Sequence, residues 1–529
     1  MSRAPWLLAC AAFALLSAAP LAAHGATDDG DPAGITPVAA TTEAVLERTI
    51  AATGERPTRE AATWTIAGND LSGSERDVRL GDDERSTVAM GPLLRTSGVF
   101  HGQRWRQTFN GRTVLESGHD PRNDQSAFAL VEGAAPDALP AAQIHLLGEI
   151  HNPKRYVLRV DFTSSVAEWI FVDEHSNLVA RREFVTEGRR ETIEYDDYRP
   201  LGTYQTPWRI VAHDERPYDT MTYRKLVDRS DMPVAVRDVA VPDNVRRLIE
   251  FPSARLSVDL PARFIDGKIV VRATVGDGRG FDAALDTGSS AIVVDRQTID
   301  DLGIPTYGRR SGFSMGPYVK SWAILPKLEI GPVVMHDVVV TVLPLSLIVD
   351  ERTRVVALLG FDFLADAVFH IDYSHRRVTA IEPSAFHPAG TATRALAVNL
   401  TDGVPRTSVA FGGASGDRFI LDTGGNRTVV FSHFASQHPM AVHDLELTGD
   451  EMQDPRHTRG YGIGGSLNFA SVVIPALSIG DRTFSRMSAY RTVDGDFNDE
   501  AGDGLIGSDI LSAFDLWLDY AESRVLLAT

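Results

Sequence analysis

The segment FDAALDTGSSAIVVD at residues 281–295 is the most informative in the sequence, because RFILDTGGNRTVVF at 418–431 repeats its pattern. In both stretches an apolar strand runs into Asp-Thr-Gly, and a second apolar strand follows. Two further pairs of segments match in the same order: LPKLEIG at 325–331 with IPALSIG at 474–480, and ALLGFDFLADAVFHIDYSHRRV at 357–378 with GLIGSDILSAFDLWLDYAESRV at 504–525. Three matching blocks in one order indicate two homologous lobes.

Between these blocks, Val, Ile and Leu alternate with polar residues, and glycines interrupt them at short intervals, as in all-β folds. We place the first lobe at residues 255–383 and the second at 393–529. The segment SAFHPAGTA at 384–392 is rich in small and turn-forming residues and is the expected linker. The predicted fold class of this half is mainly β, with two β-barrel lobes related by a pseudo-two-fold axis.

The two Asp-Thr-Gly elements predict chemistry. A carboxylate between apolar strands is costly unless hydrogen bonds or a partner hold it. A two-fold pair of such turns would bring Asp286 and Asp422 together over one site, where both cannot ionise at once. One carboxyl then keeps a proton, and the pair can act as acid and base on opposite sides of a bound water. This chemistry needs no metal and no cofactor.

The turns themselves suit this geometry. Gly288 and Gly424 permit a tight turn and a close backbone approach. We expect Thr287 and Thr423 to reach across the pair and to bond the backbone of the opposite loop, which would fix the two carboxyls in place.

Residues from about 255 to 529 resemble the pepsin and retropepsin class of aspartic proteases. Asp286-Thr287-Gly288-Ser289-Ser290 matches the first active-site loop of that class, and Asp422-Thr423-Gly424 matches the second. Leu358-Leu359-Gly360 and Leu505-Ile506-Gly507 match the element that braces each loop from below. The resemblance implies catalytic roles for Asp286 and Asp422. It implies loop support from Thr287, Gly288, Ser289, Thr423 and Gly424, and braces at Leu359, Gly360, Ile506 and Gly507.

The same resemblance implies a glycine-rich hairpin, or flap, in each lobe that closes over the substrate. The candidates are GFSMGPY at 312–318 and GYGIGGS at 460–466. The residues singled out are Gly312, Met315, Tyr318, Tyr461, Gly462 and Gly464. Because both lobes keep the loop, the brace and the flap, the chain is similar to a fused retropepsin dimer as much as to a pepsin. It departs from the class at Gly425-Asn426, where a hydroxyl residue is commoner, so we expect different pKa values for Asp422 and Asp286.

Two other motifs are rejected on context. Gly312 to Gly316 fits the serine-hydrolase pattern G-x-S-x-G, but that motif needs a following helix, and an extended segment follows here. Gly460 to Gly465 fits G-x-G-x-x-G, but the strand-like SLNFASVVIP follows it in place of the helix of a dinucleotide site.

The first half of the chain has a different sequence pattern. Residues 1–23 form an expected signal peptide, with an apolar run that ends in small residues. Residues 24–37 are predicted to be a disordered linker. Residues 38–240 predict an α+β domain with one helix, stopped by Gly54, and a meander of antiparallel strands. The pieces FNGRTV at 109–114, EWIFVDEHSNLVARR at 168–182 and YDDYRPLGTYQTPWRI at 195–210 loosely resemble lipoprotein-carrier-like half-barrels of bacterial envelopes.

Composition narrows the functions further. Among 529 residues, 52 Lys and Arg stand against 71 Asp and Glu, a net charge of −19, which is the wrong sign for a nucleic-acid surface. The one cysteine, Cys10, lies in the leader, so disulfides, zinc-cysteine sites and cysteine nucleophiles are not expected in the exported chain. A lipid anchor is not expected either, because almost no apolar run precedes Cys10. Trp105, Trp169 and Trp208 are interpreted as packing residues.

The sequence therefore predicts an exported, periplasmic or secreted aspartic endopeptidase that acts on peptide or protein substrates as a monomer, without a membrane span. The alternative is a non-catalytic periplasmic protein that binds a peptide or lipid. The N-terminal domain is a candidate site for a lipid or lipoprotein, or an inhibitory pro-region.

Overall fold

The computed structural model describes residues 30–115, 144–161, 167–186, 189–214, 216, 218–242, 246–252, 255–276, 278–313, 316–345, 354–388, 394–400, 403–445, 459–493 and 502–528. The predicted signal peptide and Met315 lie outside these residues. The chain divides between Asn244 and Val245 into two compact units.

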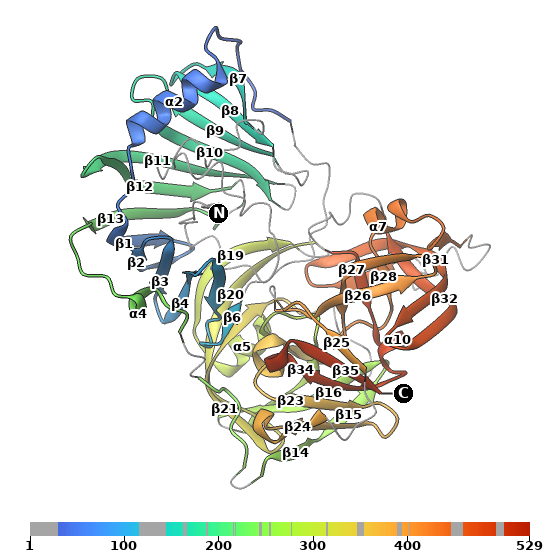
Figure 1. Ribbon diagram of the computed structural model, residues 1–529. Helices are drawn as coiled ribbons and strands as arrows, with labels where there is room; N and C mark the ends of the chain where they lie inside the picture. The colour runs from blue at the N-terminus through green and yellow to red at the C-terminus, as the bar shows by residue number, and fades with distance from the viewer. Residues whose placement is uncertain are drawn as a thin grey trace. The chain divides into compact units, whose positions relative to one another are not determined.

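The N-terminal unit is one antiparallel sheet of thirteen strands with a helix on it (Figure 1). The spatial order is β6-β5-β4-β3-β2-β1-β13-β12-β11-β10-β9-β8-β7. The strands are β1 (Arg59–Gly68), β2 (Leu71–Leu80), β3 (Asp83–Met90), β4 (Leu93–Phe100), β5 (Gln103–Gln107), β6 (Thr113–Leu115), β7 (Ile144–Ile150), β8 (Arg155–Asp161), β9 (Ala167–Asp173), β10 (Val179–Thr186), β11 (Arg189–Leu201), β12 (Tyr204–His213) and β13 (Met221–Arg229). A short helix, α4 (Val236–Val239), follows β13.

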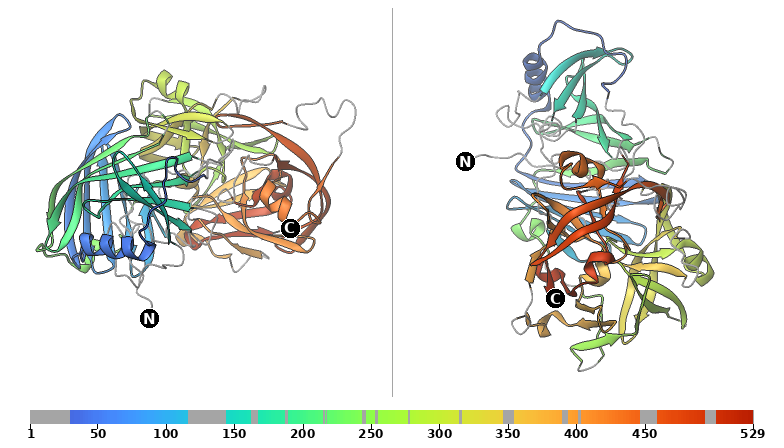
Figure 2. Two further views of the ribbon diagram at one scale, coloured as in Figure 1. Left: turned by 90° about the horizontal axis from the view of Figure 1, so that it is seen from above. Right: turned by 90° about the vertical axis from the view of Figure 1, so that its right-hand side faces the viewer.

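The helix α2 (Thr42–Thr53) forms where the apolar periodicity predicts it. Thr41 caps its first turn by accepting the N–H of Ala44, and Gly54 ends it. Val45 and Leu46 project from α2 into the main apolar core of the unit, which lies on one face of the strongly curved sheet (Figure 2). The α+β prediction is confirmed for this unit.

Residues 30–37 are ordered against the sheet, so the prediction of a disordered linker is wrong for this part. The carboxylate of Asp31 accepts hydrogen bonds from Arg159 (2.8 Å) and from the indole of Trp169 (3.0 Å). Thr36 forms a backbone bridge with Glu149. The composition of this segment predicted disorder because composition carries no information about partners more than a hundred residues away in the sequence.

The same sheet buries several charged side chains. The indole of Trp64 donates to Asp77 Oδ2 at 2.7 Å, and the hydroxyl of Ser86 donates to Glu75 Oε1 at 2.6 Å. The ammonium of Lys225 lies 4.6 Å from the centre of the Trp64 ring. This buried polar cluster adjoins the apolar core through Trp64.

The C-terminal unit contains two ring-like mixed sheets, one in each predicted lobe. In the first lobe the order is β15-β16-β17-β22-β18-β21-β20-β19, and a β16–β20 pairing closes the ring. Its elements are β15 (Ala262–Ile265), β16 (Lys268–Val275), β17 (Arg279–Leu285), β18 (Ile292–Asp295), α5 (Arg296–Leu302), β19 (Thr306–Phe313), β20 (Pro317–Ile330), β21 (Val333–Leu343), β22 (Val355–Leu359) and α6 (Phe361–Leu364).

The second lobe repeats this plan with β26-β27-β33-β28-β32-β31-β29, closed by a β26–β31 pairing, while β30 pairs with β31 alone. Its elements are β26 (Arg406–Phe411), β27 (Ala414–Leu421), β28 (Val429–Val430), α7 (Ser432–Gln437), β29 (His443–Asp444), β30 (Arg459–Gly462), β31 (Gly465–Ile479), β32 (Arg482–Thr492), β33 (Gly504–Ile506) and α10 (Ser508–Leu511). The predicted fold class, a mainly β pair of lobes after an antiparallel sheet, is confirmed.

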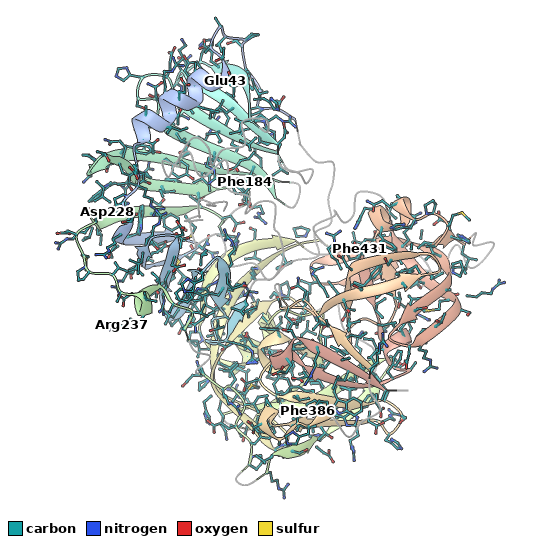
Figure 3. All side chains as sticks on the ribbon, viewed as in Figure 1. Glu43, Phe184, Asp228, Arg237, Phe386 and Phe431 are labelled. Atoms are coloured by element: carbon teal, nitrogen blue, oxygen red, sulfur yellow. The ribbon has the colours of Figure 1, made fainter. Side chains whose placement is uncertain are left out.

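A six-stranded sheet joins the lobes, in the order β14-β24-β23-β34-β35-β25 (Figure 1). Its elements are β14 (Ser257–Leu260), β23 (Val368–Asp372), β24 (Arg377–Ile381), the 3-10 turn η4 (Pro383–Ala385), β25 (Arg394–Ala397), β34 (Asp515–Asp519), the 3-10 turn η7 (Tyr520–Glu522) and β35 (Arg524–Ala528). Phe386, labelled in Figure 3, packs on a cluster of Val368, Trp517 and Leu526 from both lobes. His370 stacks on Trp517 with the two rings 4.1 Å apart.

No helix among the described residues is both long and apolar enough to cross a membrane.

Candidate active site

Each Asp-Thr-Gly loop begins at the end of an inner strand, β17 or β27, which pairs with the brace strand of the same lobe, β22 or β33. Leu285 of β17 pairs in parallel with Leu359 of β22, and Leu421 of β27 pairs in parallel with Ile506 of β33. The next N–H along each inner strand continues the ladder. Asp286 N–H donates to the Leu359 carbonyl at 3.1 Å, and Asp422 N–H donates to the Ile506 carbonyl at 2.9 Å. The two loops therefore leave their sheets in the same way.

The braces also hold the far side of each loop. The N–H of Phe361, directly after Gly360, donates to the Ser289 carbonyl at 2.9 Å. The N–H of Ser508, directly after Gly507, donates to the Gly425 carbonyl at 2.9 Å. Each loop is thus bonded to its brace before and after the carboxylate.

The two threonines bond across the lobes in a reciprocal pattern. Thr287 N–H donates to Thr423 Oγ1 at 3.1 Å, and Thr423 N–H donates to Thr287 Oγ1 at 2.9 Å. The Thr287 hydroxyl donates to the Leu421 carbonyl at 2.5 Å, and the Thr423 hydroxyl donates to the Leu285 carbonyl at 3.0 Å. Both side chains are buried. Since unpaired buried donors are costly, this set of bonds ties the loops into one unit.

The carboxyls of Asp286 and Asp422 face each other across this unit. A Cβ atom on Gly424 would lie 2.5 Å from the Asp286 Cγ, and one on Gly288 would lie 2.8 Å from the Asp422 Cγ. Only glycine fits at either position. Each carboxyl shifts the pKa of the other, and each is mostly buried with a small exposed part. That exposed part is accessible to a reactant.

The backbone donors around the two carboxyls differ in number. Asp286 Oδ1 accepts one N–H, from Gly288 at 2.9 Å. Asp422 Oδ1 accepts two, from Gly424 at 2.8 Å and from Gly425 at 3.0 Å. Hydrogen bonds of this type favour the ionised form of a carboxyl.

The pKa values follow this asymmetry. Burial and the charge of Asp422 raise the pKa of Asp286 to about 8. Burial also raises the pKa of Asp422, but the N–H groups of Gly424 and Gly425 oppose that rise. The hydroxyl of Ser289 does not contribute, because it donates to the carbonyl of Ala291 at 2.9 Å.

The predicted flap segments form two hairpins. In the first, Gly312 of β19 pairs with Tyr318 of β20. In the second, the backbone of Tyr461 pairs with Ser466, and Gly462 pairs with Gly465, which leaves Ile463 and Gly464 at the tip. Ile463 and Tyr318 both pack on an apolar cluster of the first lobe that contains Val270 and Leu358. The tip of the second hairpin therefore contacts the first lobe.

β20 begins directly after Gly316, where the first rejected motif ends, and β31 begins at Gly465, where the second ends. A strand follows each motif, so neither has the helix that a hydrolase elbow or a dinucleotide site requires.

Sequence reasoning missed Lys268 at this site. Its ammonium crosses from β16 to the second loop and donates to the Gly424 carbonyl and to Asn426 Oδ1. The sequence before it, Asp266-Gly267, signals a tight turn, but nothing in the pattern says which surface that turn faces. Within the described ranges, no group of three or more His, Cys, Asp or Glu residues could hold a metal ion.

Comparison with known proteins places the first lobe in a family. Residues 271–363 match the family model described as aspartyl protease. The matched span runs from β16 through most of α6 and includes Asp286 and the first brace. The chain therefore contains an aspartyl protease domain, and its second Asp-Thr-Gly loop is related to the first by the internal repeat. No curated protein matches the chain.

Solved structures resemble each half of the chain. An aspartic proteinase from Irpex lacteus is 14% identical, with a TM-score of 0.34, and the alignment covers 52% of this chain and 97% of that one. A LolA superfamily protein from Nitrosomonas europaea is 16% identical, with a TM-score of 0.28, over 38% of this chain and 99% of that one. A putative outer membrane lipoprotein-sorting protein domain from Vibrio parahaemolyticus is 13% identical, with a TM-score of 0.28, over 37% of this chain and 94% of that one.

Proposed function

We propose that this protein is an aspartic endopeptidase, with Asp286 and Asp422 as its catalytic pair. The observation that carries the proposal is the facing pair of carboxyls, held by reciprocal threonine bonds between two copies of one loop. The match of residues 271–363 to the aspartyl protease family supports the same reaction class.

The asymmetry of the pair supports a different role for each carboxyl. Asp422 accepts two backbone N–H groups and carries the negative charge, so it is the general base. Asp286, whose pKa is raised to about 8, keeps its proton and is the general acid.

The reaction then proceeds in two steps. Asp422 takes a proton from a water molecule while the water oxygen bonds to the scissile carbonyl carbon and Asp286 gives its proton to the carbonyl oxygen. The resulting neutral diol returns a proton to Asp286 as the carbonyl re-forms, and the C–N bond breaks. Asp422 gives its proton to the leaving amine, so both carboxyls end as they began.

The substrate that fits this reaction is an extended peptide. The hairpins β19–β20 and β30–β31 offer strand edges that can pair with a peptide backbone, so selectivity would arise from pockets for its side chains. We place the enzyme outside the cytoplasm on the strength of its leader sequence.

A cleavage assay tests the proposal. The protein is incubated with a mixed peptide library from pH 3 to 8, and the products are identified by mass spectrometry. We expect the protein to cleave peptides, and a statine-type inhibitor to block the cleavage. Asp286→Asn and Asp422→Asn should each reduce the cleavage rate at least about 1,000-fold. Asp300→Asn, an exposed substitution on α5, is the matched control and should cleave like the wild type. Full activity of either dyad variant would refute the assignment, and peptide binding without cleavage would favour a non-catalytic binding protein.

A further inference from the structure

A lysine of the first lobe reaches into the second Asp-Thr-Gly loop. Lys268 Nζ donates to the Gly424 carbonyl at 3.1 Å and to Asn426 Oδ1 at 2.6 Å. Gly424 is the third residue of the loop that carries Asp422, and Asn426 lies two residues further on. The ammonium thus spans the stretch of backbone whose N–H groups bond the Asp422 carboxylate.

The local fold directs the lysine there. Asp266 and Gly267 both have positive φ angles, 48° and 79°, and form the tight turn between β15 and β16. A Cβ atom on Gly267 would lie 2.4 Å from Ser508 Oγ, directly after the second brace. The turn is therefore pressed against the second lobe, and Lys268, the first residue of β16, has little freedom to move away.

Among the described residues, no ion pair neutralises the charge of Lys268. Both of its hydrogen-bond acceptors are neutral, and none of the described carboxylates forms a salt bridge with it. Its positive charge lowers the pKa values of both Asp286 and Asp422, against the effect of burial. A cation bonded to the loop that carries Asp422 favours a negative charge on the pair.

The other titratable groups near the pair do not supply this effect. Burial and the charge of the pair raise the pKa values of Tyr373 and Tyr520, so both phenols are neutral. Asp509 accepts hydrogen bonds from the N–H and the hydroxyl of Thr428. Burial raises the pKa of Asp509, and the positive charge of Arg427 opposes that rise. Asp266 lies on the turn of Lys268 itself.

We infer that Lys268 is a positioning residue of this active site, which holds the second loop from the opposite lobe and keeps one negative charge on the Asp286–Asp422 pair. The inference rests on the proposed protease function for its kinetic consequence. The lysine anchors the loop through Asn426, which with Gly425 is where the sequence departs from the protease pattern.

Three variants separate this role from a purely structural one. Lys268→Met removes the charge and the donors at similar length, and Lys268→Arg restores both. Lys327→Met is the control, since Lys327 is a lysine of the same lobe that pairs with Glu329. Thermal unfolding checks that all three variants fold.

The first readout is the pH profile of kcat/KM. We expect Lys268→Met to move both limbs of the bell upward by about one pH unit, because both proton losses from the pair become harder. Lys268→Arg and Lys327→Met should leave both limbs within about 0.3 unit. A profile that keeps its position in Lys268→Met, even with lower activity, would overturn the inference.

The second readout does not need turnover. The pair is titrated by NMR in protein labelled with ¹³C at the aspartate side-chain carboxyl, with the signals assigned from Asp286→Asn and Asp422→Asn. We expect the titration midpoints of the pair to rise in Lys268→Met. If the midpoints rise in a protein that cleaves nothing, the inference stands and the protease proposal fails. If the protein cleaves peptides but the midpoints do not move, the inference alone fails.

Discussion

Gly316 and Gly464 touch backbone to backbone at the tips of the β19–β20 and β30–β31 hairpins. A Cβ atom on Gly316 would lie 2.2 Å from the Gly464 carbonyl oxygen, and one on Gly464 would lie 2.0 Å from the Gly316 carbonyl oxygen. The two hairpins come from different lobes, so this contact closes a bridge between them. No side chain larger than hydrogen fits at either tip while the contact exists.

Gly316→Ala should therefore separate the hairpin tips. Gly316 has no positive φ angle, so alanine strains the contact and leaves its own backbone conformation allowed. We expect kcat/KM to fall about tenfold, with the melting temperature of the protein changed by no more than about 2 °C. Peptide cleavage kinetics and calorimetry measure the two effects. A variant with wild-type kinetics would show that the tip contact is not needed for turnover.

Ile463→Ser should weaken the hold of the second hairpin on the first lobe. Ile463 is half-buried against the apolar cluster that contains Val270 and Leu358. Losing part of that burial costs about 1 kcal/mol, which corresponds to a rise in KM of about fivefold. Val493→Ser is the control and should leave KM unchanged, because Val493 lies in the second lobe, like Ile463, but its side chain is 42% exposed. Equal effects of the two substitutions would argue against the packing contact.

Thr287→Val should loosen the joint between the lobes. The substitution keeps the shape of the side chain but removes the hydroxyl that accepts the Thr423 N–H and donates to the Leu421 carbonyl. With two buried groups left unpaired, we expect the free energy of unfolding to fall by about 2–4 kcal/mol. Urea denaturation measures the loss of free energy, and hydrogen exchange can assign it to peptides of β17 and β27. Thr287→Ser keeps the hydroxyl and should lose less than about 1 kcal/mol.

Asp77→Asn should stabilise the N-terminal unit at neutral pH. Burial raises the pKa of Asp77 to about 6, above its ordinary value of 3.8. The folded state therefore holds this proton more tightly than the unfolded state, and stability declines as the pH rises from about 4 through 6. Asparagine cannot ionise and can still accept the hydrogen bond from Trp64.

Thermal unfolding of Asp77→Asn at pH 4 and pH 7.5 measures this dependence. We expect a gain of about 1–3 kcal/mol at pH 7.5 and almost none at pH 4. Asp82→Asn, at an exposed turn residue, should show no gain at either pH. A loss of stability at pH 7.5 would instead mean that the Asp77 carboxylate is stabilised by the nearby Lys225.

The repeated elements could be predicted because their signals are local. An apolar strand followed by Asp-Thr-Gly, then a brace, occurs twice in the sequence, and the bilobal fold follows from that repetition. Lys268 gave no such signal, and its contact with Asn426 could not be predicted, because the two residues belong to different lobes and share no spacing rule. Asp77 lies in β2, whose sequence LSGSERDVRL is rich in charged residues and gives no sign of burial. Its burial depends on the curvature and the long-range pairing of a thirteen-stranded sheet, which no short window of sequence contains.

The strand pairings in the six-stranded sheet between the lobes indicate how a two-lobed chain of this kind can arise. Phe369 pairs with Leu518, and Ile371 pairs with Leu516, while His370 lies opposite Trp517. In the sequence repeat Phe369 corresponds to Leu516 and Ile371 to Leu518, so the first two pairings exchange under the pseudo-symmetry and the third maps onto itself. An isologous dimer has this same arrangement at its axis. Tandem duplication of a gene for one self-pairing half, followed by in-frame fusion, would leave this geometry, and would free the two copies of each axial residue to diverge into histidine and tryptophan.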